Sequence, residues 1–327
     1  MKVVVTGAAG FLGQKLAKAL LQRGHLVGPS GQEEAIDRLT LFDVVEARNP
    51  QVGDNRVEIV TGEISDRKLI AQTIDAKTGS VFHFASIVSA GAEADFDLGY
   101  RVNLEGALAV LDACRALPHK PRLVFTSSLA TYGGEFNQEV DDETPQTPQT
   151  SYGTQKAIGE LLINDYSRKG FLDGRSLKLP TIVVRPGKPN KAASTFASSI
   201  IREPLQGEHT ICPVDPSVRM AFLSPRRTVQ AFIHAHDLPG EAWGPWRSCN
   251  LPAIDATIQD MVEALRRVAG EAPLTRIKWQ PDPVIQRIVA TWPGRFGWDK
   301  ARRLGFQPDG SLDEIIKNFI EDDLARA

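Results

Sequence analysis

Residues 3–13, Val-Val-Val-Thr-Gly-Ala-Ala-Gly-Phe-Leu-Gly, place a short β-branched run, a glycine-rich turn and the start of a helical period in direct succession. The glycines follow the spacing G-x-x-G-x-x-G, at Gly7, Gly10 and Gly13. Glycine permits a sharp turn and lets backbone N–H groups approach a ligand, and the positive end of the following helix attracts an anion. The stretch therefore predicts a site for the pyrophosphate of a dinucleotide, with a glycine-rich loop that binds nothing as the less favoured alternative.

Outward from this turn, short apolar runs alternate with helical periods through the first 185 residues. Strands are predicted at Val3–Val5, Leu39–Val45, Val57–Val60, Val81–Phe84, Leu123–Phe125 and Ile182–Val184. Runs that are apolar on both faces are typical of a parallel sheet with helices on each side. Helical periods over Leu104–Cys114 and Ile158–Tyr166 fall between them. The expected fold is therefore α/β, a doubly wound parallel sheet of the Rossmann type.

The second part of the chain has a different composition, since 15 of the 21 prolines follow residue 179. Helices are still predicted at Met261–Val268 and Leu312–Leu324. Ser224-Pro225 is typical of an N-cap followed by proline at the first helical position, and predicts a helix that reaches Ala235.

These patterns suggest two domains. We expect residues 1–187 to form the dinucleotide-binding domain. Residues 188–327 should form mostly a smaller, C-terminal substrate-binding region, with a strand near 248–251 that returns to the sheet. A chain of 327 residues is long enough for both.

The composition limits the partners and the compartment. The chain has 38 Lys and Arg against 40 Asp and Glu, a net charge of −2. This balance provides no long-range positive field for nucleic acid or an anionic membrane, and no apolar run approaches the roughly 20 residues that span a bilayer. The first residues carry too many glycines for a signal peptide. We therefore expect a cytoplasmic protein with no nucleic-acid or membrane partner.

Cysteine and histidine give no sign of a metal site. The three cysteines, Cys114, Cys212 and Cys249, are widely spaced and form no C-x-x-C, which excludes a disulfide framework and a zinc pattern. His234 and His236 lie two residues apart in a predicted helix, so their side chains point about 200° apart and cannot chelate one ion. We expect no metal.

An acidic residue at the end of the second strand decides between NAD and NADP. Such a carboxylate accepts hydrogen bonds from the adenosine ribose and repels a 2′-phosphate. Asp43 fits this position, 30 residues after Gly13, if the connection carries an insertion around Gly28–Asp37. Asp37 is the weaker alternative, because no strand pattern leads into it. NAD is therefore the expected cofactor.

Tyr152 and Lys156 are candidates for acid–base chemistry, because four residues of helix place both side chains on one face. A nearby ammonium favours the phenolate and lowers the pKa of a tyrosine. About 24 residues earlier, Ser127 and Ser128 end a predicted strand, which is where ligands lie in open α/β sheets. A serine hydroxyl there can donate to a substrate oxygen, and strand-end capping is the alternative for both serines.

Further stretches appear in a recognisable order after the glycine-rich turn: VFHFAS at Val81–Ser86, NLEGALAVLDA around Asn103, FTSSLATYGG at Phe125–Gly134, and YGTQK from Tyr152. With these motifs the whole chain resembles the extended short-chain dehydrogenase/reductase family, also called the NAD-dependent epimerase/dehydratase family. The resemblance implies Tyr152 as acid/base, Lys156 as the group that tunes it and holds the nicotinamide ribose, and Ser128 as the third catalytic residue. It also implies cofactor contacts from Gly7, Gly10, Phe11, Leu12, Gly13, Asp43, Ile64, Ala85, Asn103, Tyr152, Lys156 and Pro186.

The stretch after the last expected strand, Val184–Lys191, bears on the substrate. Nucleotide-sugar epimerases of this family usually carry an aromatic residue and an asparagine here, whereas this chain has Pro-Gly-Lys-Pro-Asn-Lys. Lys188 suits a small anion beside the nicotinamide site, while Lys191 is better interpreted as a solvated loop charge.

Residues 89–106 and 184–208 resemble the branch of the family that oxidises D-erythronate, a four-carbon sugar acid. This resemblance implies a small acidic substrate whose hydroxyl contacts Ser128. Its carboxylate would contact a basic residue, for which Lys188, Arg226 and Arg227 are the candidates.

The leading interpretation is NAD-dependent oxidation of the C2 hydroxyl of a small sugar acid, D-erythronate to 2-dehydro-D-erythronate. One alternative is a nucleotide-sugar epimerase or dehydratase with tightly bound NAD. Another is a cofactor-binding regulator without chemistry, against which the intact set of Ser128, Tyr152 and Lys156 argues. The resemblance also implies a homodimer that pairs through the helices at Leu104–Cys114 and Ile158–Tyr166.

Overall fold

The structure, a computed structural model, describes residues 1–134, 139–187, 193–290, 292–293 and 295–324. The chain divides into two compact units, each assembled from three stretches of sequence. The first unit holds Met1–Thr131, Thr150–Lys178 and Val229–Cys249, and the second holds Tyr132–Gln149, Leu179–Thr228 and Asn250–Ala327. Within the ranges described, no helix is both long and apolar enough to cross a bilayer.

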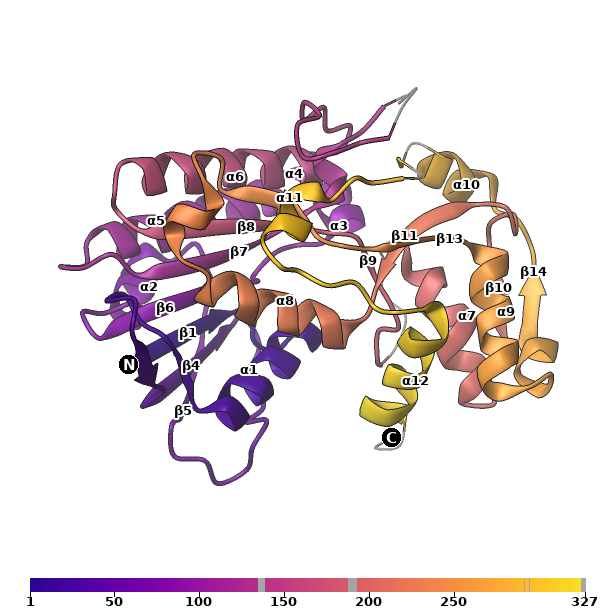
Figure 1. Cartoon of the computed structure of the whole chain (residues 1–327), viewed down its shortest axis with the longest axis horizontal. Helices are drawn as coiled ribbons and strands as arrows, with labels where there is room; N and C mark the ends of the chain where they lie inside the picture. Colours follow the sequence, from indigo (N-terminus) through magenta and orange to yellow (C-terminus); the bar gives the residue numbers. More distant parts are fainter. Residues whose placement is uncertain (135–138, 188–192, 291, 294, 325–327) are drawn as a thin grey trace. The chain divides into compact units, whose positions relative to one another are not determined.

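A seven-stranded sheet runs through the first unit, in the order β12-β8-β7-β6-β1-β4-β5 (Figure 1). The pairs from β7 to β5 are parallel. The chain builds the sheet outward from β1 in one direction, then returns to the other side of β1 with β6, so the order reverses between β1 and β6. The predicted doubly wound α/β fold is confirmed. The strands are β1 (Lys2–Thr6), β4 (Arg38–Asp43), β5 (Val57–Thr61), β6 (Thr78–His83), β7 (Arg122–Ser128), β8 (Asp173–Leu179) and β12 (Ser248–Asn250).

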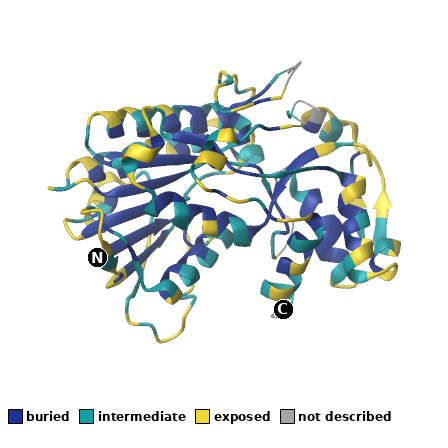
Figure 2. Ribbon diagram, in the orientation of Figure 1, coloured by how far each residue is buried: buried dark blue, intermediate teal, exposed yellow. Residues whose placement is uncertain are grey.

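Helices cover both faces of this sheet, with α5 (Gly106–Arg115) and α6 (Ser151–Arg168) on one face and α1 (Phe11–Arg23) and α8 (Pro225–Asp237) on the other (Figure 1). Buried aliphatic and aromatic side chains of the strands fill the space beneath them, so the central strands are buried along most of their length (Figure 2). The other elements of this unit are the hairpin β2 (His25–Val27) and β3 (Glu33–Ala35), α2 (Arg67–Thr73), α3 (Ser89–Ala94), α4 (Phe96–Gly99), η1 (Tyr100–Glu105), η2 (Leu129–Thr131) and η3 (Gly240–Trp243).

One predicted strand was wrong. Ile182–Val184 does not join the parallel sheet: β9 (Thr181–Ile182) pairs with β11 (Arg219–Leu223) in a separate three-stranded sheet of the second unit. Val183 and Val184 are apolar because they lie in the core of that unit. The sheet strand that was missed is β8, whose letters Asp-Gly-Arg-Ser-Leu-Lys-Leu look solvent-exposed although its central residues are buried. Buried hydrogen-bond partners for those polar groups cannot be identified from local sequence.

The second unit has its own hydrophobic core, built mainly from α7 (Thr195–Leu205), α9 (Ile258–Ala269) and α12 (Leu312–Asp322). The helices predicted over Met261–Val268 and Leu312–Leu324 correspond to α9 and α12. Thr257 and Asp260 form a capping box at the start of α9, which satisfies free N–H groups of its first turn. The remaining elements are β10 (Thr210–Cys212), β13 (Ile254–Thr257), η4 (Ala272–Arg276), β14 (Ile277–Trp279), α10 (Pro283–Ala290) and α11 (Asp299–Arg303).

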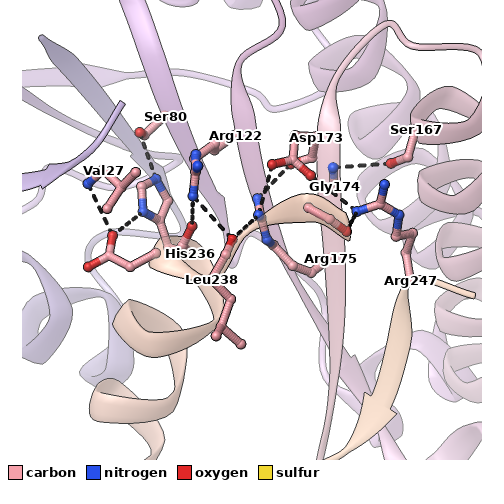
Figure 3. Close-up of polar contacts among 12 residues, drawn as sticks. Val27, Ser80, Arg122, Ser167, Asp173, Gly174, Arg175, His236, Leu238 and Arg247 are labelled. Atoms are coloured by element: carbon pink, nitrogen blue, oxygen red, sulfur yellow. Dashed lines mark hydrogen bonds and ion pairs between the residues drawn. The ribbon is translucent and has the colours of Figure 1, made fainter. Parts of the chain in front are cut away.

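A buried polar cluster lies at the amino ends of the strands of the first unit (Figure 3). Arg122 Nη1 donates to the carbonyl oxygens of His236 at 2.6 Å and Leu238 at 3.2 Å, and Arg175 Nη2 donates to Leu238 and to Asp173 Oδ2, both at 2.8 Å. These guanidinium groups satisfy carbonyls at the C-terminus of α8 and oppose the negative end of its dipole. The cluster is therefore explained by the termination of a helix.

Candidate active site

The glycine-rich turn connects β1 to α1 at the carboxyl edge of the sheet, beside the point where the strand order reverses. Gly7 has a φ of +70°, and a Cβ there would lie 2.6 Å from the backbone nitrogen of Ala85. A Cβ on Gly13 would lie 2.8 Å from the Cα of Ala8. Only glycine fits at these two positions, because the turn packs closely against the end of β6 and against the start of α1.

The start of α1 suits an anion. Its N-cap residue, Gly10, supplies no side-chain cap, and the first turn contains no acidic residue. The positive end of the helix is therefore not compensated by a carboxylate of the helix itself. Phe11 and Leu12 occupy this first turn, and their contact with a pyrophosphate stays a prediction.

Asp43 lies beside the turn, as the sequence predicted. It is the last residue of β4, and its Oδ2 accepts a hydrogen bond of 2.9 Å from the backbone nitrogen of Ala9. The expected insertion is the hairpin of β2 and β3. Asp37 precedes the opposite, amino end of β4 and pairs with the N-terminal amine of Met1, so of these two candidates Asp43 is the one that lies beside the turn.

The other candidate cofactor ligands, Ile64, Ala85 and Pro186, have different surroundings. Ile64 is buried against Gly106, so most of its side chain already lies in the core. Ala85 follows β6 and donates to Thr6 Oγ1 at 3.3 Å. Both lie near the carboxyl edge of the sheet. Pro186 belongs to the second unit.

Asn103 has its side chain fully engaged by the protein. Its Oδ1 accepts from the backbone nitrogen of Ile87 at 2.7 Å and from Ser86 Oγ at 3.0 Å, and its Nδ2 donates to Ile87 O at 3.0 Å and to Gln155 Oε1 at 2.7 Å. Asn103 therefore ties the segment after β6 to α6, on the helix turn that carries Lys156. This bracing function, and the buried Gln155 that completes it, were not recognised from the sequence.

The two serines at the end of β7 have different environments. Ser127 is 2% exposed, and its hydroxyl donates to the buried carboxylate of Glu160. Ser128 is half-buried, and its Oγ accepts from the backbone nitrogen of Ala130 at 3.1 Å, so its proton can be directed elsewhere. Ser128 is therefore the serine that can donate to a substrate oxygen.

Tyr152 and Lys156 lie on one face of the first turns of α6, as predicted. Lys156 Nζ lies 5.5 Å from the centre of the Tyr152 ring and 4.9 Å from the centre of the Phe125 ring of β7. Thr150 caps the helix by accepting from the backbone nitrogen of Gly153 at 3.1 Å, which fixes where α6 starts and so where Tyr152 lies.

Burial controls the charge of Lys156, which is 3% exposed. Removal from water lowers the pKa of Lys156 to about 7, while the carboxylate of Glu160 acts in the opposite direction. His83, stacked on Phe125 at 5.7 Å, has its pKa lowered to about 3 by burial and by Lys156, so it is neutral at neutral pH. Lys156 is therefore a lysine whose proton is available for exchange near neutral pH.

The candidate carboxylate ligands fall in the second unit. Ser224 caps α8, accepting from the backbone nitrogen of Arg227 at 3.1 Å, and Pro225 is the first helical residue, as predicted. Arg226 binds Asp322 at 2.8 Å and Glu321 at 2.9 Å, which raises the pKa of Arg226 further. Arg227 lies 3.5 Å from Glu314. Lys188 lies outside the described residues.

In the His-x-His pattern, His236 has both ring nitrogens in contact with protein groups. Its Nε2 contacts Ser80 Oγ at 2.7 Å and its Nδ1 contacts Asp237 at 2.9 Å, and burial lowers the pKa of His236 to about 4. In the part of the chain that the structure describes, no group of three His, Cys, Asp or Glu side chains could hold a metal ion.

Comparison with known proteins places this geometry in a family. The model of the NAD-dependent epimerase/dehydratase family matches residues 3–243. The chain belongs to the NAD-dependent epimerase/dehydratase family. It is 54% identical to a D-erythronate dehydrogenase of Cupriavidus necator, over 98% of each chain. It is 46% identical to a D-erythronate dehydrogenase of Haemophilus influenzae, over 99% of this chain and 100% of that one.

A solved structure has the same fold over the whole chain. A nucleoside-diphosphate-sugar epimerase from Agrobacterium tumefaciens superposes with a TM-score of 0.94 at 42% identity, covering 100% of this chain and 95% of that one. Membership confirms the family predicted from the motifs, with NAD as its cofactor. The substrate is not given by membership, because the relatives carry the names of both dehydrogenases and epimerases.

Exchanging Asp43 should change cofactor choice. We expect the unmodified protein to prefer NAD over NADP in kcat/KM, and Asp43→Asn to narrow that ratio by about tenfold, or about 1.4 kcal/mol, by removing the charge that repels a 2′-phosphate. The amide oxygen of Asn can still accept from Ala9, which keeps the turn in place. Asp37→Asn is the matched control and should leave the ratio unchanged. Equal use of both cofactors by the unmodified protein would contradict the assignment of Asp43.

Proposed function

We propose that this protein is an NAD-dependent dehydrogenase that oxidises the C2 hydroxyl of D-erythronate to 2-dehydro-D-erythronate. The observation that carries the proposal is the 54% identity, over 98% of both chains, with a D-erythronate dehydrogenase. The arrangement of Tyr152, Lys156 and Ser128 supports it, because alcohol oxidation requires a base beside the carbon that loses a hydride.

The glycine-rich turn, the uncapped start of α1 and Asp43 fit NAD. Backbone N–H groups of the turn hold the pyrophosphate, and the Asp43 carboxylate accepts hydrogen bonds from the adenosine ribose. When bound, NAD accepts the two electrons and the hydrogen that leave C2 of the substrate. Lys156 contacts the nicotinamide ribose in this proposal, as the family resemblance implies.

Side chains of the protein bind the substrate hydroxyl and remove its proton. Ser128 donates a hydrogen bond to the C2 oxygen of the substrate, while the Tyr152 phenolate removes the hydroxyl proton. The bond from oxygen to hydrogen breaks as the carbonyl forms, so the products are a 2-oxo acid, NADH and one proton held on Tyr152. Lys156 in its ammonium form stabilises the phenolate that starts this step.

A basic side chain binds the substrate carboxylate. Lys188, Arg226 and Arg227 are the candidates; within the described residues, Arg226 pairs with Asp322 and Glu321, and Arg227 pairs with Glu314. A charge-assisted contact of this kind contributes about 1.5–3 kcal/mol. The neutral lactone of the same sugar acid should therefore be a much poorer substrate than the acid.

A nucleotide-sugar epimerase is the second candidate, supported by the name of the Agrobacterium relative. The two candidates predict different products. A dehydrogenase releases stoichiometric NADH with D-erythronate, whereas an epimerase changes the sugar of a nucleotide sugar with no net NADH.

A panel of four-carbon sugar acids, their lactones and UDP- and dTDP-sugars decides between them. We expect NADH formation with D-erythronate, weak activity with its lactone, and no conversion of nucleotide sugars. The readouts are NADH absorbance and chromatography of the sugars. Epimerised UDP-sugar without NADH would overturn the proposal and establish the second candidate.

A further inference from the structure

A buried charge network lies on α6 one turn beyond Lys156. The carboxylate of Glu160, 1% exposed, accepts hydrogen bonds from Ser127 and from Ser248 Oγ at 2.8 Å, and forms an ion pair of 3.0 Å with Lys178 Nζ. Lys178 also donates to Ser248 Oγ at 3.2 Å. These four side chains come from β7, α6, β8 and β12, and the proposed reaction uses none of them.

Distance along the helix decides which catalytic group Glu160 affects more. Glu160 lies four residues after Lys156, about 6 Å along the axis, and eight residues after Tyr152, about 12 Å. Burial places the interaction with Lys156 in a medium of low dielectric constant, where a charge acts strongly.

The other charged groups near Lys156 differ from Glu160 in charge or in exposure to water. On β6, His83 is neutral near neutral pH, and on β8 Lys178 is the only other buried cation of the network. The remaining charges on the helices packed against α6 are exposed or half-exposed: Glu93 of α3, Asp97 of α4, Arg101 and Glu105 of η1, and Asp112 and Arg115 of α5. On β7, Arg122 is buried at the amino end of the strand, where it donates to the carbonyl oxygen of His236.

We propose that Glu160 and Lys178 are a pair of positioning residues that decide whether the exchangeable proton resides on Lys156 or on Tyr152. The inference rests on the proposed function in that it assigns Tyr152 as the base. Neither residue touches the substrate: Glu160 acts through its field on Lys156, and Lys178 acts by partly cancelling that field.

Two states of the site hold the same number of protons. In the productive state Lys156 is an ammonium and Tyr152 a phenolate; in the other state Lys156 is neutral and Tyr152 keeps its proton. Because Glu160 is nearer to Lys156, its negative charge favours the productive state. Because Lys178 is positive, it disfavours the ammonium form of Lys156. Removal of Lys178 should therefore favour the productive state.

Three variants of the full-length, NAD-bound enzyme separate this effect from a structural one. Glu160→Gln removes the charge and keeps the size of the side chain; its amide oxygen accepts from one serine and its amide nitrogen donates to the hydroxyl of the other. Lys178→Met removes the opposing charge, and Glu160→Gln combined with Lys178→Met leaves a neutral pair. Each is made with and without Tyr152→Phe, so that the difference in near-ultraviolet tyrosinate absorbance across a neutral to alkaline pH scan reports Tyr152 alone.

We expect Glu160→Gln to lower both the Tyr152 phenolate fraction and the plateau of kcat by about tenfold. The double variant should recover part of the lost phenolate fraction and kcat. Lys178→Met should have a higher phenolate fraction and a higher kcat than the double variant. If one of the single variants does not fold, the phenolate fraction of the other, compared with that of the double variant, still shows the direction of the effect. Asp173→Asn, which removes the charge that pairs with the buried Arg175 at the other end of β8 (Figure 3), is the matched control and should leave the phenolate fraction unchanged.

An unchanged phenolate fraction in Glu160→Gln, or a double variant no better than Glu160→Gln, would overturn the inference. The phenolate measurement requires no substrate. A failure of D-erythronate oxidation in the unmodified enzyme would therefore refute the proposed function without affecting this test.

Discussion

Tyr152→Phe should lower kcat for sugar-acid oxidation by about 10²–10⁴-fold, the range that a positioned acid–base group contributes. The phenol oxygen is lost while the ring stays beside Lys156, whose Nζ lies 5.5 Å from the ring centre. NAD affinity should change little, because the turn and Asp43 are untouched. Initial rates from NADH absorbance, with NAD affinity from titration calorimetry, provide the measurement.

Tyr166 supplies the matched control, since it lies on the same helix. Its hydroxyl donates to Asp112 at 2.9 Å, away from the glycine-rich turn, and burial raises the pKa of Tyr166. Tyr166→Phe should keep turnover near that of the unmodified enzyme and cost only some stability. Activity of Tyr152→Phe within tenfold of the unmodified enzyme would remove Tyr152 from the mechanism.

The parts of the site that the sequence predicted depend on neighbours in the chain. The turn at Gly7–Gly13, the strand that ends at Asp43 and the shared helix face of Tyr152 and Lys156 all follow from local spacing. Ser128 was preferred over Ser127 only through the family resemblance, and the structure adds a reason, because the Ser127 hydroxyl is bound to Glu160.

The parts that were missed depend on contacts between distant segments. Lys178 lies in a strand whose polar letters resemble a surface segment, yet it is buried because Glu160 and Ser248 supply its partners. Glu160, four residues after Lys156, follows a spacing visible in the sequence, but the same spacing is common on solvated helices. The hydrogen bonds by which Asn103 braces α6 were also missed, and its contact with the cofactor stays a prediction. Burial of a polar side chain is thus decided by partners that local patterns do not contain.

Lys156→Met should stabilise the protein without NAD while it removes most activity. Burial lowers the pKa of Lys156 from its ordinary 10.5 to about 7. At pH 7 the folded protein therefore holds only part of a proton that the unfolded chain binds fully. That difference costs about 3–5 kcal/mol of unfolding free energy, which methionine, apolar and similar in length, does not incur.

The pH dependence gives the sign. Between about 7 and 10.5 the unfolded chain binds the Lys156 proton and the folded protein does not, so unfolding takes up a proton and a rise in pH favours the folded state. Denaturant unfolding across this range should show stability that rises more with pH in the unmodified protein than in Lys156→Met. Subtracting the two curves cancels the other titrating groups.

Lys68, exposed on α2, is the matched control. Lys68→Met should leave both the stability at pH 7 and its pH dependence close to those of the unmodified protein, because the Lys68 side chain contacts water in the folded protein as it does in the unfolded chain. Parallel pH curves for Lys156→Met and the unmodified protein would show that Lys156 is fully charged in the folded state. Burial would then not destabilise the charged form of Lys156. There would be no physical reason for Lys156 to exchange a proton with Tyr152 near neutral pH.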